Sequence, residues 1–201
     1  MKELGEINEA ENYLKKSIDL KSNVDISYIN LAAVQKELGK LFEAEKNILK
    51  ALELNPNSSL AYNNLGNIYN AYGRVEEAEK CYLKCLDIKP VSILSINNLA
   101  KLYYKAGQYK KALPILEKSL FMKEDQETVV EVFAQCLFEL NLLKDTDIFC
   151  EKAIKKFPQN KNLKTFYGKN LLRLNRHSEG LKYLNESSGM IEFGEKNFKV
   201  V

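Results

Sequence analysis

The sequence predicts an all-α protein built from antiparallel helix pairs that stack side by side. One phrase recurs every 34 residues, as in Tyr62-Asn-Asn-Leu65-Gly66, and a turn residue such as Gly73 follows each copy. A small or short residue comes five positions after each turn residue, and proline closes three of the units. Self-similarity of this length is typical of an array of supersecondary units, which does not need one large closed core.

Each unit reads as two amphipathic helices of about fourteen residues. In the second complete unit, apolar side chains recur at helical spacing over 62–72 and again over 75–86. Gly73 stands between them where a left-handed C-terminal turn is expected, and Pro90 prevents the second helix from continuing. Gly66 is small enough to let the two helices of the pair approach closely.

The N-terminus supplies only half a unit. Ala10 and Leu14 fit second-helix positions, and no first helix precedes them, so we expect a single capping helix from Glu6 to Leu20. Taken in order, the expected divisions are a partial repeat at 1–22, complete repeats at 25–58, 59–92, 93–126 and 127–160, a degenerate repeat at 161–188, and a tail or hairpin at 189–201.

The last residues alternate apolar and polar side chains on both sides of 194–197. This pattern is typical of two short strands around a turn. We expect a short β-hairpin that folds back over the last helix pair and shields Leu181 and Leu184. A tail without regular structure, or the beginning of a further domain, is the alternative.

Charge and hydropathy exclude several classes of partner. The net charge is only +3, from 30 basic and 27 acidic residues, which gives no strong field for nucleic acid or an anionic membrane. No window is long and apolar enough to insert into a membrane, and the N-terminus lacks a signal-peptide core. We therefore expect a cytoplasmic protein, and the abundance of Asn, Lys and Ile suggests a bacterial one.

The sequence carries no recognisable catalytic or cofactor motif. Cys81 and Cys85 are four residues apart on one helix, but no further Cys or His lies near them to complete a metal site. The remaining cysteines fall at apolar repeat positions, and His177 has no nucleophile to pair with. We expect no metal, no cofactor and no enzymatic activity.

Asparagine is concentrated on the expected first helices. Asn30, Asn64 and Asn98 recur at the same repeat position, and each costs a helix roughly 0.5 kcal/mol relative to alanine. Side-chain amides both donate and accept hydrogen bonds, so a row of them can pair with an extended peptide backbone. The middle helix adds further asparagines on one polar stripe: Asn63, Asn67 and Asn70.

The repeated phrase resembles the tetratricopeptide pattern W-x2-L-G-x2-Y, A-x3-F, P over about residues 25–158. The resemblance implies a right-handed superhelical solenoid whose first helices line a concave groove. In the second complete unit the matching residues are Tyr62, Leu65, Gly66, Tyr69, Ala78, Tyr82 and Pro90.

The phrase at 63–67 also resembles units of O-linked N-acetylglucosamine transferases, in which a ladder of asparagines holds substrate peptides. That resemblance implies a ladder at Asn30, Asn64 and Asn98, which Val132 ends. Asparagines that only cap contacts between helices are the alternative. The residues predicted to bind peptide are Asn30, Asn63, Asn64, Asn67, Asn70, Asn98, Lys101, Tyr104, Lys105 and Gln135.

A second binding mode of the family is a clamp for two carboxylates. Asn67 and Asn98 match its amide positions, but Asn63 replaces the expected lysine and Val132 replaces the arginine, so the complete clamp is absent. Lys101 and Lys105 still favour a partner with some acidic character.

These observations predict a non-catalytic scaffold that binds an extended peptide or a partner protein in the groove. One alternative is a regulatory or substrate-recognition array for a glycosyltransferase-like enzyme whose catalytic domain lies elsewhere. Another is an assembly scaffold, with a homodimer through the N-terminal helix. An RNA-binding pentatricopeptide protein is disfavoured by the low net charge.

Overall fold

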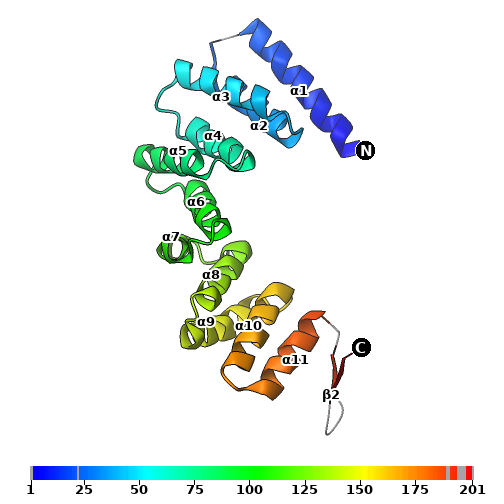
Figure 1. Ribbon diagram of the computed structural model, residues 1–201. Coiled ribbons are helices and arrows are strands. Elements are labelled where there is room, and N and C mark those ends of the chain that lie inside the picture. Colours follow the sequence, from blue (N-terminus) through cyan, green and yellow to red (C-terminus); the bar gives the residue numbers. More distant parts are fainter. Residues whose placement is uncertain (1, 22, 189–190, 194–197, 201) are drawn as a thin grey trace. The chain divides into compact units, whose positions relative to one another are not determined.

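The computed structural model describes residues 2–21, 23–188, 191–193 and 198–200, and these residues are mainly helical (Figure 1). The described helices are α1 (Lys2–Leu20), α2 (Asp25–Glu37), α3 (Leu41–Leu54), α4 (Ser59–Ala71), α5 (Val75–Ile88), α6 (Ile93–Lys105), α7 (Tyr109–Met122), α8 (Glu127–Glu139), α9 (Leu143–Lys156), α10 (Lys161–Arg173) and α11 (His177–Ser188). The all-helical fold predicted from the repeat is confirmed.

From α2 onward, the second residue after the first helix of each pair has left-handed backbone geometry. Glycine stands there in the first three pairs and asparagine in the last two, which are the residue types that tolerate a positive φ. The residue that follows closes the turn, as where the Arg74 amide donates to the Tyr69 carbonyl at 2.9 Å. The φ values are 74° at Gly39, 76° at Gly73, 70° at Gly107, 58° at Asn141 and 61° at Asn175.

Close approach of paired helices depends on small residues. A Cβ built on Gly66 of α4 would lie 2.6 Å from the Tyr82 ring of α5, a distance that no real contact allows. In the last pair, a Cβ built on Gly168 would lie 2.8 Å from the Gly180 carbonyl oxygen, and a Cβ built on Gly180 would lie 2.8 Å from the Gly168 carbonyl oxygen. The glycine therefore creates the space that the aromatic ring or the facing backbone fills.

The chain divides into two compact units, Met1–Leu102 and Tyr103–Val201. In the first unit, buried side chains from Ile29 to Cys81 form a core between α2, α3, α4 and α5. In the second, a core from Val130 to Leu171 joins α8, α9 and α10. Within each unit successive first helices touch: α2 contacts α4, and α8 contacts α10.

One ion pair recurs between successive repeats. The acidic residue lies one position after the small residue of a second helix, and its basic partner lies one position after the next turn residue. Each pair therefore links the second helix of one repeat to the residue just before the second helix of the next. The three pairs are Glu11 with Lys40 at 2.6 Å, Glu45 with Arg74 at 3.6 Å, and Asp147 with Arg176 at 2.9 Å.

The N-terminal helix begins at Lys2, earlier than the sequence predicts, and it is held by a buried carboxylate. Glu11 is only 4% exposed, and it accepts hydrogen bonds from Lys15, Lys40 and Gln35. The Lys15 ammonium, with that of Lys40, lowers the pKa of Glu11 to about 2. Glu11 thus attaches α1 both to Gln35 of α2 and to Lys40, which follows α2.

The C-terminal residues contain two short strands, β1 (Ile191–Phe193) and β2 (Phe198–Val200). They pair antiparallel with Ile191 opposite Val200, and β1 contacts α11. The turn expected at 194–197 lies outside the described residues, and shielding of Leu181 and Leu184 stays a prediction. None of the described helices combines the length and hydrophobicity that crossing a bilayer requires.

Candidate binding face on the first helices

The predicted site residues lie on α2, α4, α6 and α8. Those up to Lys101 belong to the first unit, whereas Tyr104, Lys105 and Gln135 belong to the second. They differ widely in exposure: Asn30, Lys101 and Lys105 are exposed, Asn64, Asn67, Asn70, Asn98, Tyr104 and Gln135 are half-buried, and Asn63 is buried.

Three of the asparagines form one hydrogen-bonded group, which we call the amide cluster: Asn63, Asn67 and Asn98. The Asn98 Nδ2 group donates to Asn63 Oδ1 at 3.0 Å and to Asn67 Oδ1 at 3.1 Å. The Tyr82 hydroxyl also donates to Asn67 Oδ1, at 2.8 Å, and the Ser95 hydroxyl donates to Asn63 Oδ1 at 3.0 Å. The amide cluster therefore joins two successive first helices, α4 and α6.

Asn30 and Asn64 are not members of this group, although they share the repeat position of Asn98. Asn98 is bonded because asparagines stand at 63 and 67, one repeat earlier. The corresponding places one repeat before Asn64 are held by Ile29 and Ala33, whose side chains accept no hydrogen bond. The structure thus brings the amides together at one interface between repeats, where the sequence suggested a ladder along several.

Asn63 is more enclosed than a residue on an open polar stripe would be. It is 2% exposed, because the amide of Asn98 and the hydroxyl of Ser95 cover it from α6. Its Oδ1 is satisfied by these two donors, but its buried Nδ2 has no hydrogen-bond partner among the described residues. An unpaired buried donor costs about 1–3 kcal/mol of stability, and the Asn63 nitrogen is such a donor.

Asn63 also lines a pocket of about 420 Å³ at the N-terminal ends of α4 and α6. Leu60, Val91 and Leu94 contribute apolar side chains to its wall, and they are 41%, 66% and 57% exposed. Lys89 is the charged residue among the described lining residues. Sequence reasoning missed this pocket, because it depends on a loop between repeats as well as on the first helices.

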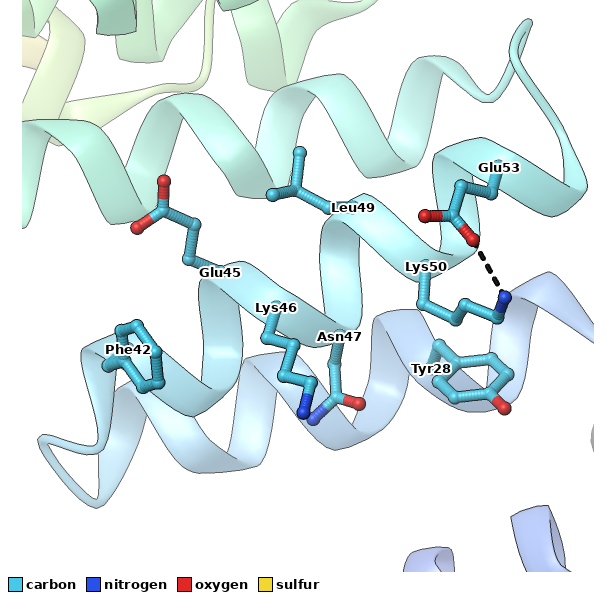
Figure 2. A pocket seen from close by; sticks show the side chains of 8 residues that line it. All are labelled: Tyr28, Phe42, Glu45, Lys46, Asn47, Leu49, Lys50 and Glu53. Carbon is cyan, nitrogen blue, oxygen red and sulfur yellow. Dashed lines mark hydrogen bonds and ion pairs between the residues drawn. The ribbon is translucent and has the colours of Figure 1, made fainter.

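A larger hollow of about 670 Å³ lies on the second helix α3 and beside Tyr28 of α2, as Figure 2 shows. Four of its eight lining residues are charged, and two of these, Lys50 and Glu53, pair at 2.7 Å one turn apart on α3. Phe42 is 73% exposed at one end. None of its lining residues belongs to the predicted site, and we found no unpaired buried polar atom among them.

The remaining predicted residues have ordinary surroundings. Lys101 and Lys105 are exposed and lie one turn apart on α6, so their charges are free to meet a ligand. The Tyr104 ring packs against Tyr109 with centroids 5.9 Å apart, and burial raises the pKa of its hydroxyl. Gln135 is half-buried on α8.

The four cysteines are free and buried, and the apolar repeat positions of Cys136 and Cys150 predicted this for those two. Burial raises the pKa of the Cys81 thiol to about 11 and those of Cys136 and Cys150 to about 12. A thiol with so high a pKa is a weak nucleophile at neutral pH. Cys85 approaches the Ser95 hydroxyl at 2.8 Å beneath the amide cluster, so it contributes to packing and hydrogen bonding there.

Solved structures share this fold at low sequence identity. A structure described as YrrB, a TPR protein with an unusual peptide-binding site, is 23% identical, with a TM-score of 0.75 over 87% of this chain and 90% of that chain. PilF of Pseudomonas aeruginosa is 18% identical, with a TM-score of 0.78 over 92% and 86%. MamA of Desulfovibrio magneticus RS-1 is 17% identical, with a TM-score of 0.76 over 82% and 93%.

Among curated proteins no match is found. The finer resemblance to O-linked N-acetylglucosamine transferases stays a prediction. A family model described as tetratricopeptide repeat matches residues 23–90 and 57–125, which together make up more than half of the chain, and a second model of the same description matches residues 2–24. The helix pairs, the left-handed turns and these matches agree, and the chain belongs to the tetratricopeptide repeat family.

Proposed function

We propose that the chain is a non-catalytic scaffold that binds an extended segment of a partner protein across the first helices α2, α4 and α6. The amide cluster, with the unpaired donor of Asn63 beside an open pocket, is the observation that carries this proposal. A buried donor without an acceptor is rare in folded proteins, and a ligand carbonyl would supply the missing acceptor.

Exposed and half-buried amides of α2 and α4 extend the face beyond the amide cluster. Asn30, Asn64 and Asn70 keep both a donor and an acceptor near the surface, which suits a peptide main chain. Such contacts hold a peptide without reading its side chains. Lys101 adds a positive charge on α6, so a segment with acidic residues is favoured.

Similarity in fold supports binding of this kind without naming the ligand. The solved YrrB structure carries a peptide-binding site by its own description, and it shares the fold over most of both chains. We expect modest affinity here, with a dissociation constant on the order of micromolar, because a free peptide loses conformational entropy when it is ordered along the face.

Selection from a random dodecapeptide library on the immobilised chain tests the proposal. We expect enriched peptides that bind with micromolar affinity. Replacing Asn64 and Asn70 with alanine should weaken the binding of these peptides about tenfold and leave the circular dichroism spectrum unchanged. The matched control is Asn12→Ala, an exposed asparagine on α1 outside the proposed face. If no peptide is enriched, or if the double variant binds as tightly as the wild type, the proposal fails.

Three other interpretations of the sequence remain predictions. They include the array that serves a glycosyltransferase-like enzyme, the cytoplasmic location and the homodimer through the N-terminal helix. For the homodimer, Tyr13 and Leu20 on α1 are 71% and 89% exposed. Sedimentation equilibrium of the wild type and of a Tyr13→Glu variant would show whether two copies associate through this helix.

A further inference from the structure

We infer that the pocket beside Asn63 selects one side chain of the bound segment. It takes an apolar residue of medium size, such as leucine, isoleucine or methionine. The main-chain carbonyl of that residue accepts a hydrogen bond from Asn63 Nδ2, and an acidic residue next to it faces Lys89. This inference rests on the proposed function and adds a sequence preference to it.

The direction of the Asn63 amide follows from its neighbours. The Tyr82 hydroxyl donates to Asn67 Oδ1, and Asn98 Nδ2 donates to the same oxygen, so Asn98 presents its nitrogen toward α4. Asn98 Nδ2 can then meet only an acceptor on Asn63, which is its Oδ1 at 3.0 Å. The Asn63 nitrogen is left on the other side of the amide, and it needs an acceptor from outside the cluster.

The pocket wall explains why an apolar side chain should accompany that carbonyl. Leu60, Val91 and Leu94 line the pocket and are all well exposed, so each gains by being covered. A volume of about 420 Å³ accommodates a leucine or methionine side chain together with part of the main chain. We call the side chains of Leu60, Val91 and Leu94 the collar.

Charge supplies the third element of recognition. Lys89 is exposed, and the other described residues of the lining are uncharged. A carboxylate on the ligand residue next to the apolar one would therefore meet a positive charge without a competing acidic group in the lining. A basic residue at the same place would be disfavoured.

Access to the amide requires a small movement. Asn63 Nδ2 is closed to water in the free chain. The collar side chains are outside the buried core, so Leu60 or Leu94 can change rotamer without opening a cavity in it. Binding then replaces an unpaired donor with a hydrogen bond, and this recovers part of what the free chain loses.

Two blocked pentapeptides, acetyl-SGLDS-amide and acetyl-SGGDS-amide, test the inference by NMR titration of the ¹⁵N-labelled full chain. We expect the first to bind about tenfold more tightly, because only it buries a side chain in the collar. It should move the Asn63 side-chain NH₂ resonances downfield in a saturable way. Backbone amides at 59–63 and 91–94 should shift with them.

Variants separate the collar from the charge. Leu60→Ser with Leu94→Ser should reduce the affinity for the leucine peptide to that for the glycine peptide. Leu83→Ser is the matched control, since Leu83 is a 44% exposed leucine of the same repeat outside the pocket lining. Lys89→Glu should lower the affinity for the leucine peptide several-fold. It should raise the affinity for a leucine peptide whose aspartate is replaced by lysine.

The two levels of the proposal fail separately. Equal affinity of the two pentapeptides, or binding that leaves the Asn63 NH₂ resonances unmoved, would overturn the pocket preference and leave peptide binding by the first helices standing. If neither pentapeptide nor any library-selected dodecapeptide shifts resonances of α2, α4 or α6, the proposed function fails, and the pocket preference fails with it.

Discussion

The buried carboxylate of Glu11 should hold the N-terminal helix in a pH-dependent way. Its pKa is lowered to about 2 from 4.5, first by Lys15 at 2.8 Å and then by Lys40 at 2.6 Å. A drop of that size corresponds to about 3 kcal/mol in favour of the docked, ionised state. Both lysine side chains are about half exposed, at 50% and 41%, so solvent screening reduces the net effect to about 2 kcal/mol.

The sign follows from the direction of the shift. Because the pKa is lower in the folded chain than in the unfolded chain, the stabilisation is complete above about pH 4.5 and is lost as the pH falls toward 2. The Glu11→Gln variant lacks it at every pH. At pH 7 we expect α1 to open roughly 30-fold more often in the variant than in the wild type, and we expect this difference to shrink below pH 4.5.

Amide hydrogen exchange measured along α1 reads this opening directly, once intrinsic rates are corrected for pH. Glu9→Gln is the matched control, because Glu9 is an exposed carboxylate on the same helix. The reasoning is refuted if the amides of α1 exchange as slowly in Glu11→Gln as in Glu9→Gln at pH 7. A difference between the variant and the wild type that stays constant from pH 7 to pH 3 would refute it equally.

Three further predictions concern packing and the amide cluster. Gly66→Ala should lower the free energy of unfolding in urea by about 2 kcal/mol, because its Cβ meets the buried Tyr82 ring at 2.6 Å; no loss would mean that the ring moves freely. Asn98→Ala should cost about 1 kcal/mol in the same assay and Asn64→Ala nothing, since only Asn98 bonds within the cluster; equal values would contradict this. Cys150, with its pKa raised to about 12, should react with iodoacetamide at pH 8 only after unfolding, as mass spectrometry of peptides would show.

The fold could be predicted because its determinants are local and repeated. A glycine after each of the first three first helices meets the need for positive φ, and Asn141 shows that the turn persists where glycine is absent. Gly66 could be assigned to close packing because its repeat position demands a small residue. Each of these inferences needs only the residue type and its register in the 34-residue period.

The candidate site could be predicted only in part, because its contacts cross from one repeat to the next. The sequence indicates which helices carry amides, but it does not show that Asn98 bonds to Asn63 and Asn67 rather than aligning with Asn64. Burial of Asn63 results from the covering groups of α6. Burial of Glu11 likewise results from α2 and from Lys40, so an acidic residue on an amphipathic helix gives no sign of it.

Confinement of the amide cluster to one interface has a consequence for how such an array acquires specificity. The turns and small residues recur through the repeats and maintain the fold, whereas the cluster needs asparagine at 63, 67 and 98 together, and the preceding repeat has Ile29 and Ala33 at the first two of these places. Replacing Ile29 and Ala33 with asparagine would place amides opposite Asn64 as Asn63 and Asn67 lie opposite Asn98. Ile29 is a core residue, 2% exposed, so that exchange would cost apolar burial. A second cluster would therefore add the loss of a buried apolar side chain to the cost of burying amides, and this favours a single contact point on the first helices.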